Sequence, residues 1–187
     1  MTPARASGNF SSTRGIFLVG FMGCGKTSVG ELLSRRLGWR FEDLDRRIES
    51  RQRCQIATIF SNQGEARFRL IEREALLELI PEMASSPTVA ALGGGALVEP
   101  ENRRMLEDSG IPAIFLDGKP EDLWRRCQQA ADERPLARDK NQFRQLYEAR
   151  RSLYMKAAVR IDTTGKTVGA VSTEVASWLE KALAEEE

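Results

Sequence analysis

The sequence contains no histidine and only three cysteines among its 187 residues. Without an imidazole, the chain cannot build a serine–histidine or cysteine–histidine nucleophile, and it has no histidine ligand for a metal ion. Cys24, Cys54 and Cys127 are odd in number, widely spaced and outside any metal-binding pattern. Free thiols of this kind suit a reducing compartment, so we expect a cytoplasmic protein.

The sequence also lacks a strong net charge and long apolar runs. Its 28 basic and 27 acidic residues give a formal charge of +1, so we expect neither a nucleic acid nor a membrane as partner. Its longest apolar runs are far shorter than the ~20 residues that span a bilayer. Residues 1–14 are polar without an apolar signal segment, and we interpret them as a disordered tail rather than an organelle transit peptide. The remaining residues, 15–187, are predicted to form a single domain.

Apolar runs alternate with longer amphipathic segments along the chain. This alternation predicts an α/β fold with a parallel sheet covered by helices on both faces. Expected strands are 16–19, 39–45, 88–92, 112–117 and 159–162. Expected helices are 26–37, 46–60, 65–80, 101–109, 120–130, 142–157 and 167–184, with a break at Gly64 and a polar loop over about 131–141.

A glycine-rich loop follows the first predicted strand. Residues 20–27 read GFMGCGKT, which fits the phosphate-binding pattern G-x-x-x-x-G-K-[ST]. Its glycines let backbone N–H groups turn toward a phosphate, and the next helix adds unpaired N–H groups. Lys26 can reach the β- and γ-phosphates, and the Thr27 hydroxyl can ligate Mg²⁺. A chance Lys-Thr after a turn is the alternative, but the strand before and helix after favour a nucleotide site.

Two carboxylates close the second predicted strand. Asp43 and Asp45 should lie at the carboxyl edge of the sheet, where ligands bind in open parallel sheets. One can hold Mg²⁺ through water, and one can accept the proton of an acceptor hydroxyl. The alternative is that they cap and start the following helix.

Three further features have both a functional and a structural interpretation. Arg69 and Glu72 share a helical face and indicate either a binding site or a solvated ion pair. The glycines at 93–95 permit either a close ligand approach or a plain turn. Arg134 in the polar loop and Arg150 in the next helix supply either cations over the nucleotide or surface solubility.

In order and spacing, the stretches GFMGCGKTSVGELLSRRLGW, FEDLDRRIE, IATIFSNQGEARFRLIE, ALGGGA, RPL and RRSLY resemble the shikimate kinases. The resemblance runs from about residue 15 to residue 183. It implies the P-loop fold of the nucleoside monophosphate kinases, with a five-stranded parallel sheet in the order 2-3-1-4-5 and a lid loop. It also implies transfer of the γ-phosphoryl group of ATP to the 3-hydroxyl of shikimate, with Mg²⁺, in chorismate and aromatic amino acid biosynthesis. We expect a monomer whose partners are shikimate and ATP.

The resemblance assigns roles to individual residues. Lys26, Asp45 and Arg134 would be catalytic, and Thr27 and Asp43 would hold Mg²⁺. The ATP contacts would come from Gly23, Cys24, Gly25, Lys26, Thr27, Ser28, Arg126 and Arg134. The shikimate contacts would come from Asp45, Arg69, Gly93, Gly94, Gly95 and Arg150, with Glu72 steadying Arg69.

Two rival functions remain open at this stage. Another small-molecule kinase of the same fold, acting on gluconate or a nucleotide, would need different acceptor groups. A catalytically dead binding relative would be expected to have lost the lysine, the acids or the substrate arginines. The family commonly has proline where Ser152 stands, and Arg151 adds a second cation beside Arg150, so the residue that reaches the substrate is open between these two arginines.

Overall fold

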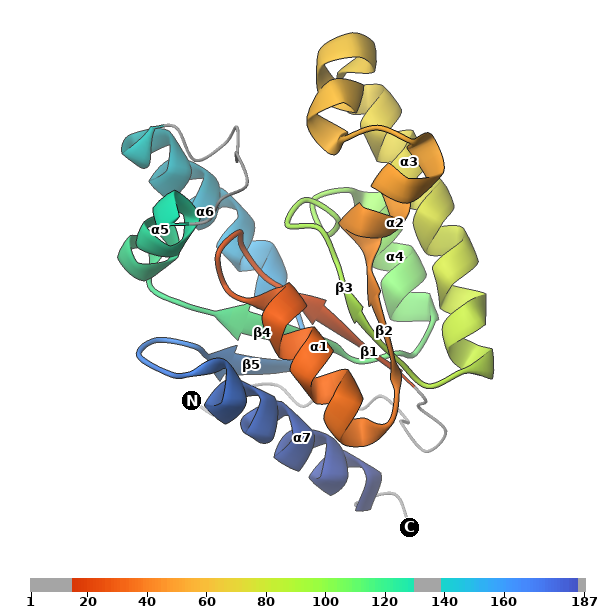
Figure 1. The fold of residues 1–187 in the computed structure, drawn as a ribbon, viewed down its shortest axis with the longest axis vertical. Helices are drawn as coiled ribbons and strands as arrows, with labels where there is room; N and C mark the ends of the chain where they lie inside the picture. Colours follow the sequence, from red (N-terminus) through yellow and green to blue (C-terminus); the bar gives the residue numbers. More distant parts are fainter. Residues whose placement is uncertain (1–14, 130–138, 185–187) are drawn as a thin grey trace.

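The computed structural model describes residues 15–129 and 139–184, and its framework is a five-stranded parallel sheet (Figure 1). The strand order is β2-β3-β1-β4-β5, and every neighbouring pair is parallel. This confirms the predicted fold class and order. The strands are β1 (Gly15–Val19), β2 (Arg40–Asp43), β3 (Thr88–Ala91), β4 (Ala113–Asp117) and β5 (Val159–Asp162).

The central strands are apolar because both of their faces are covered. Ile16, Phe17 and Leu18 of β1 have no exposed surface, and β3 and β4 are nearly as buried. The edge strands β2 and β5 carry charged side chains. Because the strands are parallel, the loops that follow them all lie at the same edge of the sheet.

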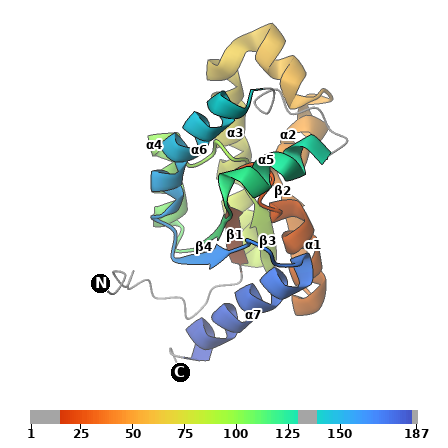
Figure 2. The same cartoon turned by 90° about the vertical axis from the view of Figure 1, so that its left-hand side faces the viewer.

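Helices form the outer two of the three layers. Helices α1 (Lys26–Leu37) and α7 (Val168–Ala184) pack together on one face, while α4 (Pro100–Asp108) and α6 (Lys140–Tyr154) lie on the other, with α3 (Ile56–Ser85) beside α4 (Figure 2). Helices α2 (Leu44–Gln52) and α5 (Pro120–Gln129) follow β2 and β4 at the carboxyl edge of the sheet.

The prediction of one helix over 46–60 was wrong. The chain leaves α2 at Arg53, which has a left-handed φ of 53°, and α3 begins at Ile56, whose N–H donates to the Glu49 carboxylate at 3.0 Å. The expected break at Gly64 is present as a kink inside α3, with φ 78° and ψ 170°. Strand β2 ends at Asp43, two residues early, because Asp43 caps α2.

The remaining predictions concern the cysteines, membrane-spanning helices and segments that lie outside the described residues. None of the three cysteines, all of which lie in the described ranges, forms a disulfide bond. Within the described ranges, no helix has the length and apolar character to cross a membrane. The expected tail (1–14) and most of the expected lid loop, Arg134 included, fall outside those ranges.

Candidate functional site

The loop after β1 forms an open cradle at the N-terminus of α1. Gly23 and Gly25 have φ angles of 80° and 94°, in the left-handed region that favours glycine. A Cβ on Gly23 would lie 2.7 Å from the Leu123 carbonyl oxygen, so this position also has no space for a side chain. Gly25 is the N-cap of α1 and offers no capping side chain, which leaves the first N–H groups of the helix available to an anion.

Lys26 folds back over this cradle. Its ammonium donates to the carbonyl oxygens of Gly20 at 2.9 Å and Phe21 at 3.3 Å. Cys24 is buried with 2% of its surface exposed, whereas Ser28 is exposed. The Cys24 thiol is therefore closed to a phosphate, and the Cys24 N–H donates to the Phe21 carbonyl oxygen at 3.3 Å.

The predicted Mg²⁺ residues meet at the mouth of the cradle. The Thr27 hydroxyl donates to Oδ2 of Asp43 at 2.8 Å. The other carboxylate oxygen, Oδ1, accepts from the N–H groups of Asp45 and Arg46 and so caps α2. The capping alternative for Asp43 is thus correct, and the same carboxylate also faces the phosphate loop.

Asp45 lies between the cradle and the glycine triplet. A Cβ on Gly93 would come within 2.5 Å of its Oδ1, so only glycine lets the carboxyl occupy this place. Burial, and then repulsion from Asp43, raise the Asp45 pKa to about 6, while Lys26 and Arg69 oppose the rise. A carboxyl with this pKa is mostly ionised at neutral pH and can accept a proton.

Arg69 is buried against the same triplet. It donates to Glu72 at 2.8 Å and to Glu65 at 3.0 Å, and a Cβ on Gly95 would lie 2.5 Å from its Nη1. Glu72 is 1% exposed, and burial raises its pKa to about 7 although Arg69 favours the ionised form. The interpretation of this pair as a solvated surface ion pair is therefore wrong.

Arg150 reaches the triplet from α6, opposite the approach of Arg69 from α3. Its Nη1 donates to the Gly94 carbonyl oxygen at 3.3 Å, and the Tyr154 hydroxyl donates to the same oxygen. A Cβ on Gly94 would also lie 3.6 Å from the Gly20 carbonyl oxygen. The triplet thus adjoins both arginines and the phosphate loop.

The neighbouring Arg151 points elsewhere. Its Nη2 donates to Oδ2 of Asp117 at the end of β4, at 2.8 Å. Consecutive residues on a helix project about 100° apart, and the two guanidinium groups reach different partners. Of the two arginines, Arg150 is the one beside Gly94.

Arg126 on α5 lies beside the phosphate loop. Its guanidinium makes long hydrogen bonds to the carbonyl oxygens of Gly23, at 3.5 Å, and Thr163, at 3.3 Å. Sequence reasoning placed it near the nucleotide, and this position adjoins both the cradle and the loop after β5.

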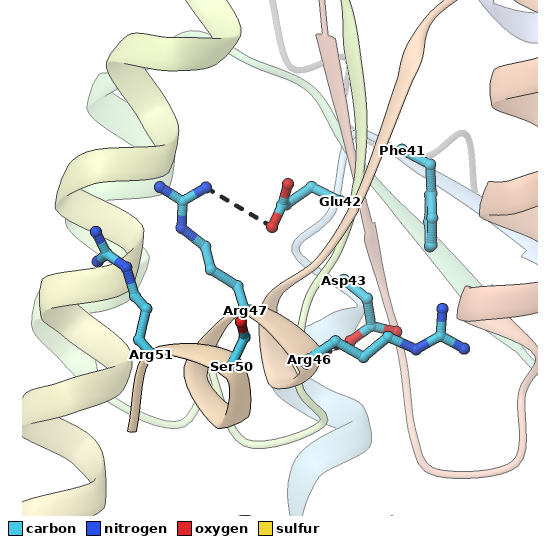
Figure 3. Close-up of a pocket in the computed structure, with 7 residues that line it drawn as sticks. All are labelled: Phe41, Glu42, Asp43, Arg46, Arg47, Ser50 and Arg51. Carbon is cyan, nitrogen blue, oxygen red and sulfur yellow. Dashed lines mark hydrogen bonds and ion pairs between the residues drawn. The ribbon is translucent and has the colours of Figure 1, made fainter. Parts of the chain in front are cut away.

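A separate hollow of about 410 Å³ lies at the β2 edge of the sheet (Figure 3). It shares Asp43 with the site but includes neither Asp45 nor the glycine triplet. Arg47 points toward Glu42 across it, with 3.6 Å between the charged groups. Its lining residues are Phe41, Glu42, Asp43, Arg46, Arg47, Ser50 and Arg51, and each of the arginines is already paired with a glutamate.

Sequence reasoning missed three contributors to the site region. Glu65 was available as the i−4 partner of Arg69, and Tyr154 as the i+4 neighbour of Arg150. Asp117 ends β4 at the same edge of the sheet as Asp43 and Asp45, so the rule that selected those acids also applied to it.

Comparison with known proteins gives a consistent result. The family model described as shikimate kinase matches residues 22–180. A shikimate kinase from Geobacter sulfurreducens is 42% identical over 172 residues, which cover 90% of this chain and 92% of that protein. One from Geobacter metallireducens is 40% identical over 173 residues, covering 91% and 94%. The structure of shikimate kinase from Acinetobacter baumannii in complex with shikimate superposes with a TM-score of 0.83 at 31% identity, covering 92% of this chain and 96% of that one.

Proposed function

This chain belongs to the shikimate kinase family, and from that premise we propose how its residues bind the two substrates and promote the reaction. The enzyme transfers the γ-phosphoryl group of ATP to the 3-hydroxyl of shikimate, which gives shikimate 3-phosphate and ADP in chorismate and aromatic amino acid biosynthesis. Phosphoryl transfer depends on positioning and charge stabilisation more than on covalent catalysis, which suits a chain without histidine.

The shikimate half of the proposal rests on one observation: Arg69 and Arg150 converge on the glycine triplet, with Asp45 beside it. Shikimate carries a carboxylate and three hydroxyl groups. We assign the carboxylate to the two guanidinium groups, because charge-assisted hydrogen bonds from arginine suit a planar anion. Backbone groups of residues 93–95 and the Asp45 carboxylate are then left for the hydroxyls.

Asp45 is proposed to orient the acceptor hydroxyl and to take its proton. Its position between Lys26 on the phosphate side and Arg69 on the carboxylate side supports this role, since both cations act on its charge. A raised pKa of about 6 keeps it basic enough to accept a proton while it remains ionised at neutral pH.

The phosphate half of the proposal places the ATP phosphates in the cradle. Residues 23–28 would surround them, with Lys26 moving from the carbonyl oxygens of its own loop to the β- and γ-phosphates. Arg126 would flank the adenine. Arg134 would approach the transferring phosphoryl group from the lid loop, a role that rests on the sequence resemblance.

Mg²⁺ fits the oxygen donors at the mouth of the cradle. Thr27 and Asp43 offer a hydroxyl and a carboxylate that already lie within hydrogen-bonding distance, and both are hard ligands that Mg²⁺ prefers. The ion would neutralise phosphate charge, with its remaining ligands drawn from water and from the phosphates. These two side chains are the ones we propose for it.

We further propose that residues 15–187 form one domain with a lid over about 131–141, and that the enzyme is a cytoplasmic monomer. Three cysteines without a disulfide bond support a reducing compartment. Light scattering coupled to gel filtration would test the monomer, for which a chain of 20.9 kDa sets the expected mass.

A coupled assay of ADP release tests the substrate assignment directly. Shikimate should support turnover, while quinate, gluconate and nucleoside monophosphates should support little or none. Turnover only with gluconate or a nucleotide acceptor would overturn the assignment and favour another kinase of this fold. Absence of turnover with every acceptor, with ATP binding retained, would favour a catalytically dead relative.

A further inference from the structure

Asp117, at the end of β4, is a buried carboxylate that the proposed reaction does not use. Only 3% of its surface is exposed. Its Oδ1 accepts from the N–H of Gly118 at 2.9 Å and lies 3.0 Å from the Tyr147 hydroxyl. Its Oδ2 accepts from Arg151 and from Arg160, both at 2.8 Å. A buried charge needs such partners, so this carboxylate links the elements that supply them, α6 and β5, to the end of β4.

Two of the side-chain donors come from one face of α6. Tyr147 and Arg151 are four residues apart, so they project from the same side of that helix. The Tyr147 hydroxyl also lies 3.1 Å from the carbonyl oxygen of Gly118, the residue that follows Asp117. Helix α6 is thereby attached to the carboxyl end of β4 by a phenol and a guanidinium.

The residue adjacent to Arg151 is Arg150, which lies beside Gly94. If α6 turned about its axis, both arginines would move together, because they share one rigid helix. Fixing Arg151 on Asp117 therefore fixes the direction in which Arg150 points. The Tyr154 hydroxyl on the Gly94 carbonyl oxygen holds the next turn of the same helix.

We propose that Asp117, Tyr147 and Arg151 form a positioning cluster that sets the rotation of α6 and so orients Arg150 toward the shikimate carboxylate. The inference rests on the proposed function, because it assigns that carboxylate to Arg150. A guanidinium held in its binding direction loses less conformational freedom when the substrate arrives, which strengthens binding. These residues act through Arg150 and do not touch the substrate themselves.

The chain supplies a matched control in Arg160. It donates to the same oxygen of Asp117 at the same distance as Arg151, but it comes from β5 instead of α6. Both arginines are partly exposed, with side-chain exposures of 35% and 48%. Removing either one takes away one cation and one hydrogen bond from Asp117, and only removal of Arg151 takes away a contact between Asp117 and α6.

The test compares Arg151→Ala and Arg160→Ala by steady-state kinetics and thermal unfolding. We expect Arg151→Ala to raise KM for shikimate about tenfold, as expected for loss of one charge-assisted hydrogen bond, with KM for ATP changed less than about twofold. Arg160→Ala should lower Tm to a similar extent but keep KM for shikimate within about twofold. Arg151→Lys should recover part of the loss, since a lysine retains the charge.

A double variant separates positioning from direct contact. In an Arg150→Ala background, adding Arg151→Ala should change KM for shikimate by less than about twofold, because the side chain that it orients is gone. An undiminished tenfold effect in that background would overturn the proposal. So would an equal rise in KM for Arg151→Ala and Arg160→Ala, or a loss of Tm without any change in KM.

A milder variant keeps the test decisive if Arg151→Ala fails to fold. Tyr147→Phe removes only the hydroxyl and should raise KM for shikimate about two- to threefold, and an unchanged KM would count against the cluster. Failure of this inference leaves wild-type activity with shikimate intact. Failure of the proposed function would instead appear as absence of that activity in the wild-type enzyme.

Discussion

The Arg69 guanidinium donates to the Glu72 carboxylate at 2.8 Å, and both residues belong to α3 and have buried side chains. Glu72 is held in turn by the amide of Asn102 on α4, at 3.5 Å. The pair lies against Gly95, and Gly93 is the glycine that accommodates Asp45. An ion pair in this position fixes the direction of Arg69 before any ligand arrives, and it also makes the site sensitive to pH.

Glu72→Gln should remove part of the pH dependence of stability. Burial raises the folded-state pKa of Glu72 from 4.5 to about 7, so between these values the folded enzyme holds a proton that the unfolded chain has released. Stability of the wild type therefore falls as pH rises through this window and levels off above it. Glutamine resembles the protonated form, so the variant should match the wild type near pH 5 and exceed it near pH 8 by up to about 3 kcal/mol.

Urea unfolding at pH 5, 6, 7 and 8 measures this difference. Asp45, whose pKa is also raised, is present in both proteins, so its own contribution largely cancels in the comparison. A variant that becomes progressively less stable than the wild type as pH rises would show that Arg69, not burial, dominates the pKa of Glu72.

Asp45→Asn should abolish turnover while ATP binding is largely kept. The amide cannot accept the hydroxyl proton, and loss of a general base typically costs ~10²–10⁴ in rate. Single-turnover rates measure the loss of turnover, and calorimetry measures the ATP binding that is retained. Glu49→Gln is the matched control, since Glu49 lies one turn later on α2 and accepts from the N–H of Ile56. Unchanged turnover in Asp45→Asn would make this acid structural.

Thr27→Val should raise the Mg²⁺ concentration needed for half-maximal rate. Valine keeps the volume of threonine but removes the hydroxyl that faces Asp43. We expect about a tenfold rise, the low end for loss of one hydrogen bond to a charged group, with KM for shikimate within about twofold. Ser34→Ala provides the comparison, because that hydroxyl lies on the same helix and donates to the Glu31 carbonyl oxygen. An identical Mg²⁺ dependence in all three proteins would remove Thr27 from the metal site.

The sheet and the phosphate loop were predictable because each depends on local sequence. Apolar runs such as residues 16–19 specify buried parallel strands, and the glycines of the loop specify a backbone that other residues rarely adopt. The break at Arg53 was not predictable, because a left-handed arginine carries no propensity signal and the turn is held by Glu49. That contact exists only after the chain has folded.

The pairing of side chains was the harder part of the site. Arg150 and Arg151 are chemically identical, and only the rotation of α6 decides that one lies beside Gly94 and the other on Asp117. The surface interpretation of Arg69 and Glu72 failed for a related reason, since α4 and the glycine loop cover a helical face that looks solvated in isolation.

The affinity for shikimate and for its methyl ester, measured in the wild type and in Arg69→Ala and Arg150→Ala, tests the central claim most directly. Loss of the carboxylate charge should weaken wild-type binding by about a hundredfold, in keeping with charge-assisted hydrogen bonds of ~1.5–3 kcal/mol each. In each variant the ester penalty should shrink to about tenfold or less, because one of the two guanidinium groups is already missing. A full hundredfold penalty in both variants would contradict the assignment of the substrate carboxylate to Arg69 and Arg150.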